Sequence, residues 1–293
     1  MTIPLILLAI VFFGMQTIAL KKIKVTTLRE NLLQTGTFSG ITAVCFWLWG
    51  AFAGISISPI TLFYGILFGV IFIATISSYY YAMQTGPLSY TAFFYSSSMI
   101  IPALAGVMIW KDEFRWTMGL GILFFLAAFY FISVPGAQDK GKGNRKWLVL
   151  CFVTWLLNGS LSVLVKAQQM AMKGQEATSM TTVAFSCACV LCILCYFLLL
   201  ARDRKLSSAG REIANMRSIT LPLLALAVGN GGGNFTVTYL ASRVSSAYLY
   251  PFVLGGMMVG VTAYSILGLK EKINRYGAIG IALGIAGLLA INL

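Results

Sequence analysis

The chain has 293 residues, of which 59% are hydrophobic and 10% are charged, and its mean hydropathy is +0.86. Soluble domains carry about 25% charged residues, so this composition excludes a soluble globular protein and predicts an all-α integral membrane protein. The net charge of +13 does not indicate a nucleic-acid partner, because the 21 Lys and Arg residues lie in short gaps between apolar segments.

Ten apolar segments are long enough to cross a bilayer as helices, which takes about 20 residues. They cover approximately residues 3–20, 32–53, 60–83, 88–110, 116–134, 147–171, 178–201, 219–241, 245–268 and 275–292. The first segment ends in a lysine cluster rather than a small-residue cleavage site, so we expect a membrane helix there and not a cleavable signal peptide. The hydrophilic stretch 135–146 predicts a basic linker between two five-helix units, 1–134 and 147–293.

The second half of the sequence is a weak repeat of the first. An ungapped comparison superposes Lys270-Glu271 on Lys111-Asp112, Tyr239 on Tyr80, Phe252 on Phe93, and Gly280-Ile281 on Gly121-Ile122. Because each half holds an odd number of segments, the two halves must cross the membrane in opposite directions. The sequence therefore predicts ten transmembrane helices arranged as two inverted five-helix repeats, an architecture of many secondary transporters.

The basic residues predict the orientation of the chain. The gaps after the first, third, fifth, seventh and ninth segments contain 16 of the 21 Lys and Arg residues. By the positive-inside rule these gaps are cytoplasmic, which places both termini outside the cell membrane. We expect the amphipathic gap 202–217 to lie along the cytoplasmic surface, with its basic residues against anionic membrane lipids.

The stretch Gly229-Asn230-Gly231-Gly232-Gly233-Asn234 lies in the middle of the eighth segment. Such residues are tolerated at mid-depth only where they face protein or a water-filled cavity. Two interpretations stay open: the glycines and asparagines pack helices together, or the asparagines line a substrate site. In the ungapped comparison of the two halves, Asn230 aligns with Ile71 and Asn234 aligns with Thr75. The polar stretch is therefore not common to both repeats. That asymmetry favours a binding role for the asparagines.

Other candidates for substrate binding are mostly uncharged side chains in the apolar segments that can form hydrogen bonds. Tyr80 and Tyr239 occupy equivalent positions of the repeat, and Lys166 could bind a substrate carboxylate, although a lysine near a span end more often reaches to water. The predicted substrate-binding set is Gln16, Tyr80, Tyr95, Asn158, Lys166, Asn230, Asn234 and Tyr239.

An enzyme is the competing class of function. The chain has no histidine, and its eight acidic residues all lie at span ends or in gaps, so no buried base, nucleophile or metal cluster can be assembled. Cys189, Cys192 and Cys195 have the spacing of iron–sulfur ligands but lie on one apolar helix, where packing explains them better. We therefore expect no catalysis, metal or cofactor, and we disfavour a membrane enzyme or a non-transporting scaffold.

Two five-segment halves share further motifs. Each has Gly-x6-Lys in its first segment, at Gly14 and Gly159, and a very short connection between its third and fourth segments. The fourth segments end in Trp110-Lys111-Asp112-Glu113-Phe114 and Leu269-Lys270-Glu271-Lys272-Ile273. Over nearly the whole chain this pattern resembles the EamA-like branch of the drug/metabolite transporter superfamily. From the short connections we predict helical hairpins whose two helices pack along their length.

The resemblance implies a ten-helix secondary transporter, with two departures from the family pattern. Asp112 stands where the family has glutamate, and Pro102 and Pro251 do not match the usual proline of the fourth helix. Many relatives keep both termini in the cytoplasm, which disagrees with the charge distribution, and we follow the charge distribution.

The absence of an acidic residue at mid-depth disfavours exchange of organic cations for protons. We expect a small neutral or zwitterionic polar metabolite, similar to an amino acid, to be moved by alternating access. The alternative is broad drug efflux through an aromatic pocket of low polarity. One chain contains both repeats, so a monomer suffices for a complete site, although a dimer is possible. A cavity reaching mid-depth would support transport, whereas apolar packing that closes the bundle around residues 230–234 would count against it.

Overall fold

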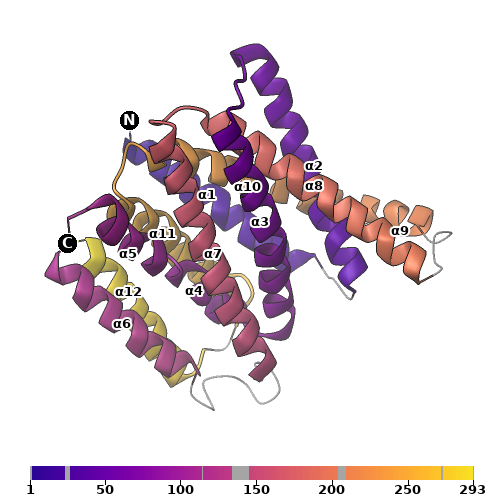
Figure 1. Ribbon diagram of the computed structural model, residues 1–293. Helices are drawn as coiled ribbons and strands as arrows, with labels where there is room; N and C mark the ends of the chain where they lie inside the picture. Colours follow the sequence, from indigo (N-terminus) through magenta and orange to yellow (C-terminus); the bar gives the residue numbers. More distant parts are fainter. Residues whose placement is uncertain are drawn as a thin grey trace.

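The computed structural model describes residues 2–23, 27–113, 115–133, 145–203, 209–271 and 273–292. Within these ranges the protein contains helices and no strand (Figure 1). The first group of helices is α1 (Thr2–Lys22), α2 (Leu28–Ala53), α3 (Pro59–Thr85), α4 (Leu88–Ser97), α5 (Ile100–Trp110) and α6 (Trp116–Ser133). The second group is α7 (Arg145–Ala171), α8 (Ala177–Arg202), α9 (Ala209–Asn215), α10 (Thr220–Ala241), α11 (Ser246–Leu267) and α12 (Arg275–Asn292), with a short 3-10 helix at Met216–Ile219.

Seven helices of the described chain are long and apolar enough to cross a membrane: α1, α2, α3, the α4–α5 unit, α7, α8 and α11. The shorter helices α6 and α12 are also apolar. The protein is therefore an all-α, multi-pass membrane protein. Most of the predicted linker, up to residue 144, lies outside the described residues, as do residues 204–208 of the amphipathic gap.

Local sequence explains where several helices begin and break. Thr27 and Glu30 form a capping box at the start of α2. Between α4 and α5 the helix is interrupted at Ser98 and Met99. Pro102 lies four residues after Ser98, and a proline ring clashes with the carbonyl group four residues before it. The interruption therefore occurs where Pro102 disfavours a continuous helix.

The helices of the two halves pack in equivalent pairs. Helix α1 packs on α10 and α11, and α7 packs on α3 and on the α4–α5 unit. Helices α2 and α8 contact each other, and α6 and α12 lie side by side at the opposite edge of the bundle (Figure 1). Exchanging α1 with α7, α2 with α8, α3 with α10, α4–α5 with α11, and α6 with α12 leaves these principal pairs unchanged.

The prediction that each hairpin packs along its length is wrong. Helix α3 packs mainly on α7 and α8 rather than on α4, and α10 packs mainly on α1 and α2 rather than on α11. The reason is the direction in which the small residues face. Gly65 and Gly69 of α3 lie against α8, at Val183 and Cys187. A short connection joins two helix ends but does not determine which faces pack.

Helix α10 runs without interruption through the glycine-rich stretch. A Cβ atom on Gly229 would lie 2.6 Å from the backbone oxygen of Phe12, and one on Gly233 would lie 2.8 Å from the ring of Phe13. These glycines therefore allow α1 to approach the backbone of α10 closely. The packing interpretation of the glycines is confirmed.

Candidate functional site

A small cavity, here called the central cavity, lies between α1, α3, α4, α7, α10 and α11. Its volume is about 30 Å³, and one water molecule needs roughly 10–15 Å³ of such space. It is lined by Phe13, Phe68, Phe72, Thr75, Ile76, Tyr95, Asn158, Leu161, Ser162, Val165, Asn234, Val237, Tyr250, Val253 and Leu254. The lining combines aromatic rings with uncharged hydrogen-bonding groups and includes no acidic or basic side chain.

Asn158 joins the cavity wall to the interruption between α4 and α5. Its side-chain nitrogen donates to the hydroxyl of Ser98 at 2.7 Å and to the carbonyl oxygen of Tyr95 at 3.4 Å. These groups lie where the helix breaks, so Asn158 ties α7 to the interruption between α4 and α5. On the same face of α7, Ser162 accepts a hydrogen bond at its carbonyl oxygen from the Tyr250 hydroxyl, at 2.8 Å.

Asn230 and Asn234 form a pair one turn apart on α10. The Asn234 side-chain nitrogen donates to the Asn230 side-chain oxygen at 2.7 Å and to the Asn230 carbonyl oxygen at 2.9 Å. Asn230 is fully buried, and its side-chain nitrogen has no hydrogen-bond partner among the described residues. An unsatisfied buried donor costs about 1–3 kcal/mol. In the described residues these side chains make no bond to another helix, so they do not act as interhelical contacts of the expected kind.

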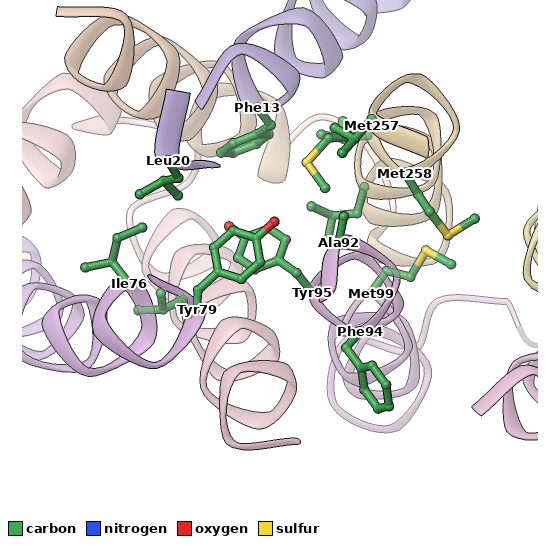
Figure 2. Packing of buried hydrophobic residues seen from close by; sticks show 14 of the residues in the cluster. Phe13, Leu20, Ile76, Tyr79, Ala92, Phe94, Tyr95, Met99, Met257 and Met258 are labelled. Atoms are coloured by element: carbon green, nitrogen blue, oxygen red, sulfur yellow. The ribbon is translucent and has the colours of Figure 1, made fainter. Parts of the chain in front are cut away.

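A polar cluster that includes Thr17 of α1, Tyr79 of α3 and Tyr95 of α4 lies beside the central cavity, and Figure 2 shows its two tyrosines. The rings of Tyr79 and Tyr95 stack with their centroids 4.3 Å apart. The Tyr79 hydroxyl donates to Thr17 at 3.4 Å, and the Thr17 hydroxyl donates to the Met257 sulfur at 3.6 Å. Gln16 is buried, and its side-chain oxygen has no hydrogen-bond partner among the described residues. Figure 2 shows Phe13 and Met257 across from the two stacked tyrosines.

The structure brings some of the predicted site residues together and leaves others apart. Tyr95, Asn158 and Asn234 line the central cavity. Asn230 is hydrogen-bonded to Asn234, and Gln16 is buried where α1 lies against Gly229 of α10. Tyr80 instead donates from its hydroxyl to the side-chain oxygen of Gln34, at 2.8 Å, away from the cavity lining. The tyrosine that stacks on Tyr95 is its neighbour Tyr79, which the comparison of the repeats did not favour.

Tyr239 and Lys166 also lie outside the cavity lining. Tyr239 is 38% exposed, and the guanidinium carbon of Arg243 lies 3.8 Å from its ring centroid. Lys166 is only 4% exposed, so it does not reach to water. Its ammonium group donates to the carbonyl oxygens of Ala241, at 2.7 Å, and Val244, at 3.1 Å, where α10 ends.

Lys166 belongs to an arrangement that we call the second clamp: Lys166, Asp112 and the connection between α10 and α11. Asp112 accepts a hydrogen bond from the backbone N–H of Ser246, at 2.8 Å, where α11 begins. A cation at the end of one helix and an anion at the start of the next both match the helix dipoles. The lysine comes from the same half as this connection, and the aspartate comes from the other half.

The first clamp repeats this arrangement at the connection between α3 and α4. Lys21 donates to the carbonyl oxygens of Met83, at 2.9 Å, and Gly86, at 3.3 Å. Glu271 accepts from the backbone N–H groups of Leu88, at 2.8 Å, and Ser89, at 3.2 Å. The Gly-x6-Lys motif and the acidic residue after each fourth segment therefore hold the two connections.

The residue before each acid adopts the same unusual backbone conformation. Lys111 and Lys270 have φ values of 58° and 53°, in the left-handed region. After each of them the acid's N–H donates to a carbonyl oxygen six residues earlier, from Asp112 to Gly106 at 3.0 Å and from Glu271 to Ser265 at 3.1 Å. These matched turns aim both carboxylates at the opposite half of the chain.

The sequence interpretation missed most of the aromatic lining. Phe68, Phe72 and Ile76 recur at four-residue spacing on α3, which brings them to one face of the helix. Asn158 and Ser162 have the same spacing on α7. Reading each polar residue together with its neighbours one turn away would have extended the predicted set to these positions.

Comparisons with known proteins find a similar fold but identify no family. No protein-family model matches the chain, and no curated protein is similar to it. A solved structure described only as the crystal structure of a protein aligns with 99% of this chain and 95% of its own, with a TM-score of 0.64 and 15% sequence identity. At that identity the likeness shows a shared fold alone.

Proposed function

We propose that this protein is a secondary transporter that moves a small neutral or zwitterionic polar metabolite across the cytoplasmic membrane by alternating access. The observation that carries the proposal is the composition of the central cavity. The cavity lies between helices of both halves, where amide and hydroxyl groups of Asn158, Asn234 and Tyr95 meet aromatic rings without any acidic or basic side chain. Such a lining favours an uncharged or internally balanced solute, such as an amino acid.

Ten transmembrane helices in two inverted repeats are part of the proposal. Helix α10 supplies the eighth span, and α6 and α12 supply the fifth and tenth. The packing pairs that survive exchange of the halves support this arrangement, as do the two clamps, each built from a lysine of one half and an acid of the other. Membership of the EamA-like branch of the drug/metabolite transporter superfamily accounts for the same features.

The central cavity has room for only about two or three water molecules, which is too little for a metabolite. The glycines of α10 also close tightly on Phe12 and Phe13 of α1, and this is the apolar packing around residues 230–234 that counts against transport. We therefore assign the described conformation to a closed state of the transport cycle. Substrate access then requires one of the clamped connections to move. The uneven distribution of basic residues supports an orientation in which the α3–α4 connection faces the cytoplasm and both termini face outside.

Broad drug efflux is the second candidate. It is favoured by Phe13, Phe68, Phe72 and Tyr250, whose rings form much of the cavity wall. A lipophilic cation would, however, have no carboxylate to meet there. Thermal unfolding of the purified protein against amino acids, sugars, nucleosides and lipophilic cations separates the candidates, because a ligand that binds the folded state raises the unfolding midpoint.

Transport in proteoliposomes then tests the site with the ligand that the screen identifies. Asn234→Ala should abolish uptake with little loss of folded yield, because Asn234 borders the cavity and is not fully buried. The matched control is Asn215→Ala, on the exposed part of α9, which should transport normally. Retained uptake in Asn234→Ala would return the asparagine pair to a structural role, and exchange of quaternary ammonium ions for protons would refute the neutral-solute proposal.

A further inference from the structure

A groove distinct from the central cavity opens on the outer surface between α1, α10 and α11. Its volume is about 640 Å³. The groove walls come from apolar residues of these three helices, and the lining contains one charged residue, Lys22, at the end of α1. Figure 1 shows these helices behind the layer that contains α3 and α7.

Two glycines make the groove hollow. Gly14 of α1 and Gly260 of α11 both line it, and a Cβ atom on either would meet nothing within 4 Å. Gly256 and Gly260 are four residues apart, a spacing that often brings two helices close together. Gly256 does lie against Ile10, but Gly260 faces the groove. The missing side chains therefore leave space that no other helix of the described chain fills.

The length of the groove matches one leaflet of a bilayer. Along α1 its lining runs from Ile10 to Lys22, which at 1.5 Å per residue is about 18 Å. The hydrocarbon core of a bilayer is about 30 Å thick, so one leaflet contributes roughly half of that. The groove thus extends from the level of Lys22 to about the middle of the membrane. Lys22 is exposed and lies at the end of the bundle that carries most of the basic residues.

We propose that this groove binds one acyl chain of an anionic phospholipid from the leaflet on the basic side, with the lipid phosphate at Lys22. The apolar walls match the chain, and the lysine matches the phosphate in charge and depth. Met257 lines the groove on one side and accepts the hydrogen bond from Thr17 on the other. The bound acyl chain therefore contacts Met257, and Met257 lies next to the stacked Tyr79 and Tyr95 (Figure 2).

Native mass spectrometry and thermal unfolding in detergent test the proposal with phosphatidylglycerol and phosphatidylcholine of identical acyl chains. The wild-type protein should retain phosphatidylglycerol and gain a higher unfolding midpoint with it than with phosphatidylcholine. Lys22→Gln should reduce this preference at least several-fold. The control Lys173→Gln, at an exposed lysine just after the C-terminal end of α7, should leave the preference unchanged. Equal retention of both lipids by the wild-type protein would overturn the proposal.

Filling the groove gives an independent test. Gly14→Leu and Gly260→Leu should each fold, because both positions have open space and leucine favours a helix more than glycine does. Each should lower retention of phosphatidylglycerol, while the control Ala51→Leu, on an exposed part of α2, should not. Unchanged retention in both filled variants would refute the groove as the site. A shift from dimer to monomer in these variants would assign the groove to a second copy of the chain instead.

Discussion

The two clamps use the same parts at opposite ends of the bundle, but their acids accept different sets of hydrogen bonds. Glu271 of the first clamp accepts from two backbone N–H groups, from the hydroxyl of Ser89 at 3.1 Å, and from the hydroxyl of Ser265. Among the described residues, Asp112 of the second clamp accepts from the backbone N–H of Ser246 alone, and the buried Ser246 hydroxyl has no partner.

The difference arises from two positions of the repeat. A shorter acid, Asp112, replaces the glutamate, and Gly106 stands where the second half has Ser265. A Cβ atom on Gly106 would lie 2.5 Å from the Asp112 carboxylate, so a serine cannot supply the missing hydroxyl without displacing the acid. The acid of the second clamp therefore accepts fewer hydrogen bonds than the acid of the first, and we expect the second clamp to be the weaker one. In the proposed transporter the α10–α11 connection, on the side with few basic residues, opens at a smaller energetic cost.

The largest difference is expected from removing the two acids. Glu271→Ala leaves the first turn of α4 without its acceptor, and hydrogen bonds to charged groups contribute about 1.5–3 kcal/mol each. Asp112→Ala removes one such bond. The free energy of unfolding, measured by thermal or denaturant unfolding in detergent, should fall by clearly more in Glu271→Ala. Equal losses, or a greater loss in Asp112→Ala, would show that the clamps do not differ in strength.

Replacing Lys166 separates stability from substrate binding. Lys166→Met keeps the length of the side chain but leaves the carbonyl groups of Ala241 and Val244 without their donor, which should cost about 1–3 kcal/mol. Because Lys166 does not line the central cavity, the increase in unfolding midpoint caused by a saturating substrate should persist. Loss of that increase in a folded Lys166→Met variant would restore the lysine to the substrate site. Asn234→Ala is the reciprocal comparison: it should show no increase, and its own loss of stability should not exceed about 1–3 kcal/mol, because the buried Asn230 side-chain oxygen loses its donor.

Exchanging the residues that distinguish the clamps gives a smaller effect. Gly106→Ser forces its Cβ against Asp112 and Ser246, and overpacking of this kind costs about 1–3 kcal/mol. Ser265→Gly removes one hydrogen bond to the Glu271 carboxylate and should cost about 1.5–3 kcal/mol. Measurements of the free energy of unfolding of both variants check these two losses. Stabilisation by Gly106→Ser would mean that the second clamp accepts a hydroxyl after all.

Much of this architecture could be predicted from the sequence, but the roles of particular residues could not. Apolar segment lengths located α1, α3 and α7 closely, because a helix in lipid needs a long apolar run. The comparison of the repeats found Lys21 and Lys166 as equivalent residues, yet it could not show that their ammonium groups reach helix ends more than 60 residues away in sequence. The interruption at Ser98 was available from Pro102 by counting back four residues.

The candidate site was predicted only in part for a geometrical reason. Tyr79 and Tyr80 are adjacent, so they point about 100° apart, and the sequence alone does not say which one faces α4. The repeat favoured Tyr80, whose hydroxyl bonds to Gln34, whereas Tyr79 stacks on Tyr95. Asn158 and Asn234 were found because an amide at mid-depth in an apolar helix has few explanations. The aromatic lining was missed because phenylalanine is ordinary in any apolar segment.

The smallest predicted effect concerns Glu176, which holds the start of α3 at the end of the bundle that contains the second clamp. Partial burial raises the pKa of Glu176, but hydrogen bonds from Thr61, Ser58 and Ser56 outweigh it and hold the pKa below its usual value. A carboxylate whose pKa is depressed by folding contributes stability above its unfolded pKa, about 4.3, and loses it as the pH falls through the folded value.

The unfolding midpoint of the wild-type protein should therefore exceed that of Glu176→Gln at neutral pH and approach it as the pH falls below about 4.3. The difference should be modest, because the carboxylate is largely accessible to solvent and its interactions are screened. Gln175→Ala, which changes the exposed and uncharged neighbour of Glu176, is the control and should show no such convergence. A constant difference between wild type and Glu176→Gln at every pH would mean that the side chain stabilises α3 by packing rather than by its charge.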